Sequence, residues 1–494
     1  MFKIDTAYCS DKYQYTMGKS FRDAGMTDKR AIFNLFFRSA PDHNNWAVVS
    51  GIEEVLQMIS SLGSKDSSFF EKFIPGDENA DYREYLSKMK FTGNVYAMRE
   101  GEIAFPTQPI ITVEGPVIEA QVLETPLLCI MNHQMAIATK ASRVTRSTSK
   151  PVNEFGSRRA HGPWAAIYGA KAAYIGGCNS TSNILTSDIF GVPVSGTMAH
   201  SFITAFGCTV VGELEAFRVY LKGHYGEPLI LLVDTYDTLR CGIKNAIKAF
   251  KDATVDDNYP QPYGIRLDSG DLTYLSVKCR EELDKAGLTK CKIFATNSLD
   301  EYIISDIEKQ GAKIDAYGVG DAIATSKHNP CFGNVYKLVQ IDGQGVLKRS
   351  EDKAKVINPG FQVSYRIIKE GLFKADITCL RGDSLSESIE KRETITIRDE
   401  RDDTKITTFI SGTYDYRILQ QQVMQDGTKI LKDIPVKERR DYYLNNLSSL
   451  NETERRLINP HFYKVDISDD LYDLKQSLIN SLIKEIRESY GTEQ

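Results

Sequence analysis

The densest group of reactive side chains in the sequence is Arg266-Leu267-Asp268-Ser269-Gly270-Asp271, which follows a short apolar run. An arginine at the end of a buried strand costs free energy unless it meets an anion, and its planar fork suits a carboxylate or a phosphate. Asp268 and Asp271 could bind a divalent cation through oxygen, or stabilise positive charge on a sugar. The alternative is an internal Arg–Asp pair that only holds the fold together. In the first case the group is a site for a small anionic substrate.

His200 is a second candidate, because it closely follows another apolar run that ends at Ser195-Gly196-Thr197. At the expected start of a helix, a histidine could act as a base, a metal ligand or a nucleophile. A lone histidine is more often a structural residue, and the chain contains only 7. No second histidine stands at a metal-ligand spacing, so the sequence does not predict a zinc site.

Two further groups place glycine or positive charge at the ends of apolar runs. Gly318 and Gly320 precede Asp321, and glycines at such a point let backbone N–H groups approach a phosphate. The pattern is not a complete G-x-G-x-x-G, and a tight βα turn is the alternative. Arg158 and Arg159 end another run and add positive charge. A solvated loop is the alternative there, and for Arg159 we favour it.

These groups recur because residues 150–341 repeat one arrangement about eight times, a short apolar run followed by a longer polar or helical stretch. The last run, Val335 to Ile341, leaves the series. Alternating strands and helices predict a parallel sheet. We expect an α/β fold with an irregular (β/α) barrel of about seven to eight parallel strands, whose reactive groups gather where the strands end.

The rest of the chain does not follow this repeat. We therefore expect an N-terminal α+β domain at residues 1–120, the barrel at 121–341, and a C-terminal segment at 342–494 that packs partly with the N-terminal domain. Gly93 to Val117 reads as a small antiparallel sheet. Near the end, an apolar stripe from Leu471 to Ile486 predicts an amphipathic helix, with Ser468 placed to cap it.

Composition narrows the class of protein. The 494 residues are 41% hydrophobic and 26% charged, which is typical of a globular protein. The net charge of −5, without a long basic run, argues against nucleic acid as the main partner. No apolar stretch is long enough to span a bilayer, and the start has no secretory apolar core. Nine scattered cysteines without a C-x-x-C pair indicate reduced thiols, so we expect a cytoplasmic protein.

Several motifs together resemble the nicotinate phosphoribosyltransferase family, a group of type II phosphoribosyltransferases. They occur in the family's order over roughly residues 8–360: Asp11 to Gln14, Phe36 to Arg38, Leu123 to Leu128, Phe155 to Arg159, Gly196 to Phe202, Arg266 to Asp271, and Val335 to Val339. The resemblance implies a barrel beside an N-terminal domain, and a homodimer with shared active sites. It implies that nicotinate and phosphoribosyl pyrophosphate react to nicotinate mononucleotide and pyrophosphate in NAD salvage. Magnesium and coupled ATP hydrolysis are also implied.

The resemblance also implies roles for single residues. ATP would phosphorylate His200, and the nicotinate carboxylate would bind to Thr197 and Arg266. Tyr13 would stack on the pyridine ring, from the partner subunit. Asp268 would lie close to the ribose and the magnesium. Asp271 stays a second metal candidate on the residues alone. The remaining substrate-binding candidates are Arg158, Ser182, Gly318, Gly320, Asp321 and Thr325.

One position departs from the family. Many members have Thr where this chain has Asp321, and a carboxylate cannot donate a hydrogen bond to a phosphate. The alternatives are that Asp321 binds magnesium, or that phosphate contact rests on the Gly320 backbone and Thr325.

Three other functions compete with this one. Nicotinamide phosphoribosyltransferase uses an acidic residue near the ring, but the corresponding stretch here, Asn179 to Asn183, has no acid. Quinolinate phosphoribosyltransferase is a shorter chain that lacks the Gly-Thr-x-Ala-His motif. From another class, a non-catalytic barrel could bind a phosphorylated ligand or a protein. Loss of His200 or Arg266 would favour it, and both are present.

Overall fold

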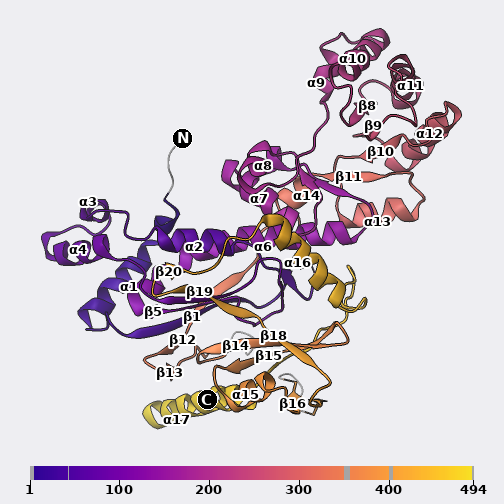
Figure 1. Cartoon of the computed structure of the whole chain (residues 1–494). Helices are drawn as coiled ribbons and strands as arrows, with labels where there is room; N and C mark the ends of the chain where they lie inside the picture. Colours follow the sequence, from indigo (N-terminus) through magenta and orange to yellow (C-terminus); the bar gives the residue numbers. More distant parts are fainter. Residues whose placement is uncertain (1–4, 43, 350–355, 400–403, 492–494) are drawn as a thin grey trace. The chain divides into compact units, whose positions relative to one another are not determined.

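The computed structural model describes residues 5–42, 44–349, 356–399 and 404–491 (Figure 1). The chain divides into two compact units. The barrel unit comprises residues 137–330 and 435–440, and the sheet unit comprises 1–136, 331–434 and 441–494. The long helix α6 (Glu124–Arg146) begins in the sheet unit and ends in the barrel unit.

A six-stranded sheet with the order β7-β6-β11-β10-β9-β8 forms the centre of the barrel unit. Every pair of adjacent strands in this sheet is parallel. The first strand in the sequence, β6, pairs with the last, β11, as in a closed barrel. The ends of this curled sheet are β7 and β8, and between them Val194 makes an isolated parallel bridge to Thr181. The strands are β6 (Val152–Glu154), β7 (Ser180–Thr181), β8 (Leu229–Leu232), β9 (Tyr263–Leu267), β10 (Lys292–Ala295) and β11 (Ala316–Val319).

The described strands are therefore fewer than the seven to eight expected. The run before Ser195 makes only the bridge at Val194. The run from Val335 to Ile341 belongs to β12 (Asn334–Ile341), which pairs antiparallel with β1 (Arg30–Phe37) in the sheet unit. The sequence pattern is local, and it does not show which strand a given run will pair with.

Helices connect these strands and cover their outer face. They are α7 (Pro163–Ile175), α8 (Ile184–Phe190), α9 (His200–Thr204), α10 (Val210–Gly223), α11 (Ile243–Asp252), α12 (Leu272–Lys285), α13 (Glu301–Lys309) and α14 (Asp321–Ala324), with short turns η3 (Ser157–Arg159) and η4 (Thr238–Gly242). Strand side chains alternate between two faces. Ile265, Leu267 and Ile293 join the buried core under the helices, so Arg266 and Phe294 face the barrel interior.

The sheet unit contains a seven-stranded and a six-stranded sheet, which both take strands from distant parts of the chain. The first has the order β13 (Gln344–Gly345), β12, β1, β5 (Ile111–Pro116), β3 (Asn94–Met98), β19 (Gln420–Gln425), β20 (Thr428–Lys429). The second has the order β17 (Ile406–Phe409), β16 (Ile395–Arg398), β21 (Val465–Ile467), β15 (Leu372–Leu380), β14 (Gln362–Lys369), β18 (Asp415–Ile418). A short pair, β2 (Ala47–Val48) and β4 (Ile103–Ala104), adds to them. Since β3 pairs with β19, N-terminal and C-terminal residues share one sheet.

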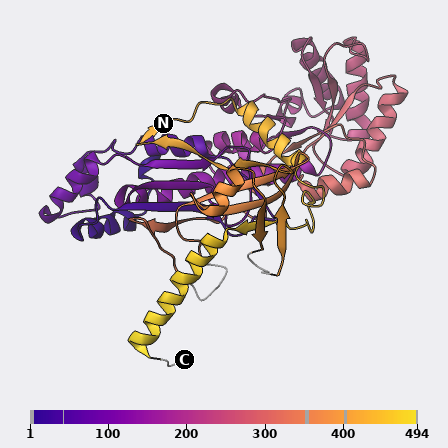
Figure 2. The same ribbon diagram turned by 60° about the horizontal axis from the view of Figure 1, so that its bottom comes forward.

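The sheet unit also contains several helices. They are α1 (Lys12–Asp23), α2 (Ile52–Ser60), α3 (Ser67–Glu71), α4 (Ala80–Lys88), α5 (Val117–Gln121), α15 (Ser384–Glu390) and α17 (Asp469–Tyr490), with turns η1 (Thr6–Tyr8) and η2 (Asp77–Asn79). Helix α16 (Val436–Ser449) begins in the barrel unit. The predicted cap of α17 is confirmed, because the Ser468 hydroxyl accepts a hydrogen bond from the Leu471 N–H at 3.2 Å. Figure 2 shows α17 extending away from the strands of its unit. No helix among the described residues has the length and apolar character needed to cross a membrane.

Candidate active site

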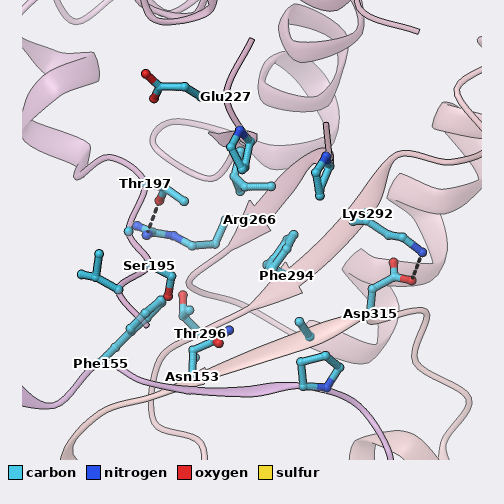
Figure 3. A pocket seen from close by; sticks show the side chains of 18 of the residues that line it. Asn153, Phe155, Ser195, Thr197, Glu227, Arg266, Lys292, Phe294, Thr296 and Asp315 are labelled. Atoms are coloured by element: carbon cyan, nitrogen blue, oxygen red, sulfur yellow. Dashed lines mark hydrogen bonds and ion pairs between the residues drawn. The ribbon is translucent and has the colours of Figure 1, made fainter. Parts of the chain in front are cut away.

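Arg266 lies inside the barrel unit and is only partly matched by acceptors. Its Nη1 donates to the Thr197 hydroxyl at 2.8 Å (Figure 3), and its Nη2 donates to the Met198 carbonyl at 3.0 Å. Its buried Nε has no hydrogen-bond partner within the described parts of the chain. Burial lowers the pKa of Arg266, while the carboxylates of Asp268 and Asp234 oppose that shift. A partly buried cation whose hydrogen-bond partners are neutral, and which keeps a free donor, is prepared to receive an anion.

A cavity of about 780 Å³ lies in front of this guanidinium. Figure 3 shows Asn153, Phe155, Phe294 and Thr296 around it, on or beside β6 and β10. The two phenylalanines give apolar walls, whereas Arg266 provides a charged end. This combination suits a flat, ring-containing anion.

His200 begins α9 and lies beside two carboxylates. Its Nδ1 is 3.0 Å from the Thr235 hydroxyl. Its Nε2 is 3.6 Å from Asp268 Oδ2 and 4.0 Å from Asp234 Oδ1. The histidine side chain is 41% exposed, so a substrate can reach it. The Thr235 hydroxyl orients the ring.

Asp234 and Thr235, which follow β8, were not among the residues singled out from the sequence. Asp234 is buried and accepts hydrogen bonds from the Asp268 N–H at 3.0 Å and the Ser269 hydroxyl at 2.5 Å. Its Oδ1 has no hydrogen-bond partner among the described residues. The apolar run that ends at Val233 could have indicated Asp234. An acid that follows a parallel strand lies at the same edge of the sheet as the end of the Arg266 strand.

The two acids considered for metal binding differ in position. Asp268 faces His200 and accepts a hydrogen bond from the Thr296 hydroxyl. Asp271 caps α12 instead, because its side chain accepts from the Tyr274 N–H at 2.9 Å. The described residues contain no group of three or more His, Cys, Asp or Glu placed to hold a metal ion. Magnesium commonly binds through one or two carboxylates plus substrate phosphates, and Asp268 with Asp234 fits that pattern better than Asp271 does.

The glycine turn packs tightly against the loop after β6. A Cβ on Gly318 would lie 2.5 Å from Phe155, and one on Gly156 would lie 2.6 Å from the Gly320 carbonyl oxygen, so both positions require glycine. Asp321 begins α14, and its carbonyl accepts from the Thr325 hydroxyl at 2.8 Å. The turn is thus positioned by backbone contact.

The loops after β6 and β7 meet at the same edge of the sheet. Arg158 is exposed on η3, and its charge contributes to lowering the pKa of Arg266, after burial itself. Exposed Ser182 donates its N–H to the Glu154 carbonyl at 3.0 Å. The next residue, Asn183, donates to the Ser157 hydroxyl at 3.1 Å.

Tyr13 belongs to the sheet unit, on α1, and is 48% exposed. Its hydroxyl donates to Glu124 Oε2 at 3.4 Å. Burial, followed by the charges of Glu124 and Asp11, raises the pKa of Tyr13. The exposed ring is free to stack on a ligand.

Comparison with known proteins identifies the family. Residues 9–132 match a model of the nicotinate phosphoribosyltransferase N-terminal domain, and residues 361–475 match its C-terminal domain. Nicotinate phosphoribosyltransferase from Bacillus subtilis (strain 168) is 38% identical over 502 residues, which cover 100% of this chain and 99% of the relative. The chain belongs to the nicotinate phosphoribosyltransferase family. Nicotinate phosphoribosyltransferase 2 of Arabidopsis thaliana is 32% identical over 95% of this chain and 93% of its own length.

A solved structure of a family member supports the fold. The crystal structure of human nicotinic acid phosphoribosyltransferase has a TM-score of 0.80 and 27% sequence identity, covering 96% of this chain and 99% of that chain. A mixed α/β fold with a curled parallel sheet and a second, sheet-rich part is therefore confirmed.

Proposed function

We propose that the chain transfers phosphoribosyl from phosphoribosyl pyrophosphate to nicotinate, giving nicotinate mononucleotide and pyrophosphate in NAD salvage. The observation that carries the proposal is Arg266, a partly buried cation whose buried Nε has no partner among the described residues, at a partly apolar cavity large enough for a ring. Nicotinate combines a flat ring with one carboxylate, and thus fits both features. The relatives that match over the whole chain carry this enzyme's name.

In this proposal Arg266 and Thr197 hold the nicotinate carboxylate. Their mutual hydrogen bond at 2.8 Å sets the orientation of the guanidinium before substrate binds. Phe155 and Phe294 contact the ring within the cavity. The pyridine nitrogen is already a nucleophile, so orientation is the main requirement and no protein base need activate it.

Charged groups at the carboxyl ends of the strands would help pyrophosphate to leave. Asp268 lies where it can stabilise an oxocarbenium-like ribose. Arg158, the turn from Gly318 to Asp321, Thr325 and Ser182 contact the phosphates and ribose in the same proposal. Magnesium, held by Asp268 and substrate oxygens, would neutralise the leaving group's charge.

In the same proposal ATP phosphorylates His200, whose Nε2 forms a bond to the γ-phosphorus while the bond to the leaving ADP breaks. A neutral imidazole is a competent nucleophile, and the Thr235 hydroxyl at Nδ1 favours attack by Nε2. Phosphate on Nε2 would lie beside the carboxylates of Asp268 and Asp234, at 3.6 and 4.0 Å from that atom before reaction. Their repulsion would reshape the pyrophosphate site and couple ATP hydrolysis to turnover.

The active form is proposed to be a homodimer in which Tyr13 completes the partner's site. Mixing inactive Tyr13→Ala protein with inactive His200→Ala protein should restore activity if subunits exchange, because one mixed site then has both residues. Exchange without recovery would place Tyr13 in its own subunit's site or outside any site. We also propose a cytoplasmic location, which the nine free cysteines support.

The direct test is incubation of the purified protein with nicotinate, phosphoribosyl pyrophosphate, magnesium and ATP, read by mass spectrometry. Nicotinate mononucleotide should form, and its yield should fall without ATP. Arg266→Lys supplies the matched control, because it keeps the charge but loses the bidentate fork. Absence of the mononucleotide with wild-type protein would favour the non-catalytic barrel.

A further inference from the structure

The cavity beside Arg266 does not stop at the carboxyl ends of the strands. Thr197, Arg266 and Thr296 line it at or near those ends. Pro228 and Lys292, which precede or begin their strands, line it at the opposite end. Because all six strands are parallel, residues that begin strands share one end of the sheet. The cavity therefore spans the length of the strands.

Small side chains explain why the interior is open. Barrel interiors are normally filled by layers of branched side chains. Here β11 contributes only Ala316 and Gly318 to the cavity, and β8 contributes Ile230. At Gly318 no larger residue fits, since a Cβ would lie 2.5 Å from Phe155. The volume of about 780 Å³ exceeds what a single pyridine ring needs.

The amino-end mouth is exposed, rigid and partly apolar. Pro151, Pro228 and Pro262 each directly precede a strand, line the cavity and are exposed to solvent. Proline has a fixed φ and no N–H, so this rim presents apolar rings rather than hydrogen-bond donors. It suits the face of a flat heteroaromatic ring.

One ion pair and one histidine–carboxylate hydrogen bond lie beside these prolines. Lys292 Nζ is 3.2 Å from Asp315 Oδ1, and His224 Nδ1 is 3.1 Å from Glu227 Oε2 (Figure 3 shows the first pair). All four side chains are at least 36% exposed. Exposed pairs of this kind contribute little stability, so they can open at low cost.

We propose that nicotinate enters and leaves through this amino-end mouth while phosphoribosyl pyrophosphate occupies the carboxyl end. The inference rests on the proposed function. Phosphates and magnesium at the carboxyl rim would cover Arg266 from that side, so a second path lets the base reach it. Lys292 attracts the carboxylate at the mouth, Phe294 contacts the ring along the cavity, and Arg266 receives the carboxylate.

The test measures the association rate of labelled nicotinate by rapid mixing. The protein is used free, and then saturated with magnesium and a non-reactive carbocyclic analogue of phosphoribosyl pyrophosphate. In the wild type, the two rates should agree within about threefold. Ala316→Phe fills the amino half of the cavity, and Lys292→Trp plugs its rim. With the analogue bound, each should slow association by about tenfold or more. Without the analogue, each should change it by less than about threefold.

Lys313→Trp is the matched control, because Lys313 is an exposed lysine that does not line the cavity. It should behave as the wild type. If Ala316→Phe fails to fold, the result for the surface variant Lys292→Trp tests the proposal alone. The proposal is overturned if the analogue alone slows wild-type association by about tenfold, or if neither variant differs from Lys313→Trp. Failure of free wild-type protein to bind nicotinate would instead reject the proposed function, and the path with it.

Discussion

Arg366 in the sheet unit and Arg266 in the barrel unit are both held inside the protein, but they meet different acceptors. Arg366, on β14, is fully buried and donates from Nε to Asp376 at 2.8 Å and from Nη1 to Glu102 at 2.5 Å. Its Nη2 donates to Asp376 at 2.6 Å and to the Ile103 carbonyl at 2.7 Å. Burial acts against the charged form, but Asp376 and Glu102 raise the pKa of Arg366 overall.

Arg266 shows the opposite pattern. Its two bonds go to a hydroxyl and a carbonyl, and burial lowers its pKa. This difference in hydrogen-bond partners indicates a structural role for Arg366 and a ligand-binding role for Arg266. Carboxylates saturate Arg366, so it can only hold strands together. Arg266 keeps unmet capacity for an anion, so the fold bears its desolvation cost for a ligand.

The largest effect should come from breaking the saturated site. Arg366→Met leaves Asp376 buried without its cation and leaves Glu102 with Arg417 as its remaining cation, so the free energy of unfolding should fall by about 3–5 kcal/mol. Activity per folded molecule should stay near the wild-type value. Denaturant unfolding measures the first quantity. The control is Arg218→Met, which breaks an exposed pair with Asp252 and should cost at most about 1 kcal/mol. Equal losses would remove the distinction between the two kinds of arginine.

His200→Ala tests the chemistry beside the unsaturated arginine. ATP-coupled synthesis should fall by about a hundredfold or more, with slow ATP-independent synthesis remaining because the pyridine nitrogen attacks unaided. Label from γ-labelled ATP should be acid-labile and base-stable in the wild type, and absent in the variant. His461→Ala, far from the barrel residues in sequence, should keep the label. Label that persists in His200→Ala would assign the phosphate to another residue.

Arg266→Lys compares the second arginine with the first. The KM for nicotinate should rise about 30-fold, equivalent to roughly 2 kcal/mol, because lysine lacks the planar fork of arginine. The free energy of unfolding should change by less than about 1 kcal/mol, since no carboxylate loses its only partner. An unchanged KM together with a lower thermal midpoint would make Arg266 a structural residue like Arg366.

Thr197→Val should have the smallest effect. It removes the hydroxyl that accepts from Arg266 Nη1, so KM for nicotinate should rise about fivefold, or roughly 1 kcal/mol. KM for phosphoribosyl pyrophosphate should not change, which distinguishes a positioning role from general damage. Thr204→Val, at the exposed end of α9, serves as the control. Equal changes in both KM values would indicate a disturbed fold.

The sequence predicted which residues lie at the ends of the barrel strands better than it predicted the residues that hydrogen-bond to them. The apolar runs in the sequence predicted the strand ends that carry Arg266, Asp268, Thr197 and His200. In the structure Arg266 contacts Thr197, and His200 lies beside Asp268. Asp234 was missed because an aspartate after β8 has no motif of its own. Its role appears only when hydrogen bonds to Asp268 and Ser269 are visible.

Long-range pairing was the other limit. The run Val335–Ile341 has the same local pattern as a barrel strand, yet it pairs with β1, some three hundred residues earlier in the chain. Asp271 was a metal candidate because it stands near Asp268 in the sequence, and local pattern did not show that its side chain also caps α12. The Arg366 cluster joins Glu102 to Asp376, so no local pattern could have shown it.

We propose that Arg266, through its unpartnered Nε–H donor, makes the site select a carboxylate. The most direct test is the ratio of kcat/KM for nicotinate and for nicotinamide in the wild-type protein. An amide in the same place leaves the buried guanidinium without a counter-charge, which should cost roughly 2 kcal/mol or more. The wild-type protein should prefer nicotinate by at least about 30-fold, and Arg266→Lys should lose most of this preference. Comparable kcat/KM values for the two bases would contradict it.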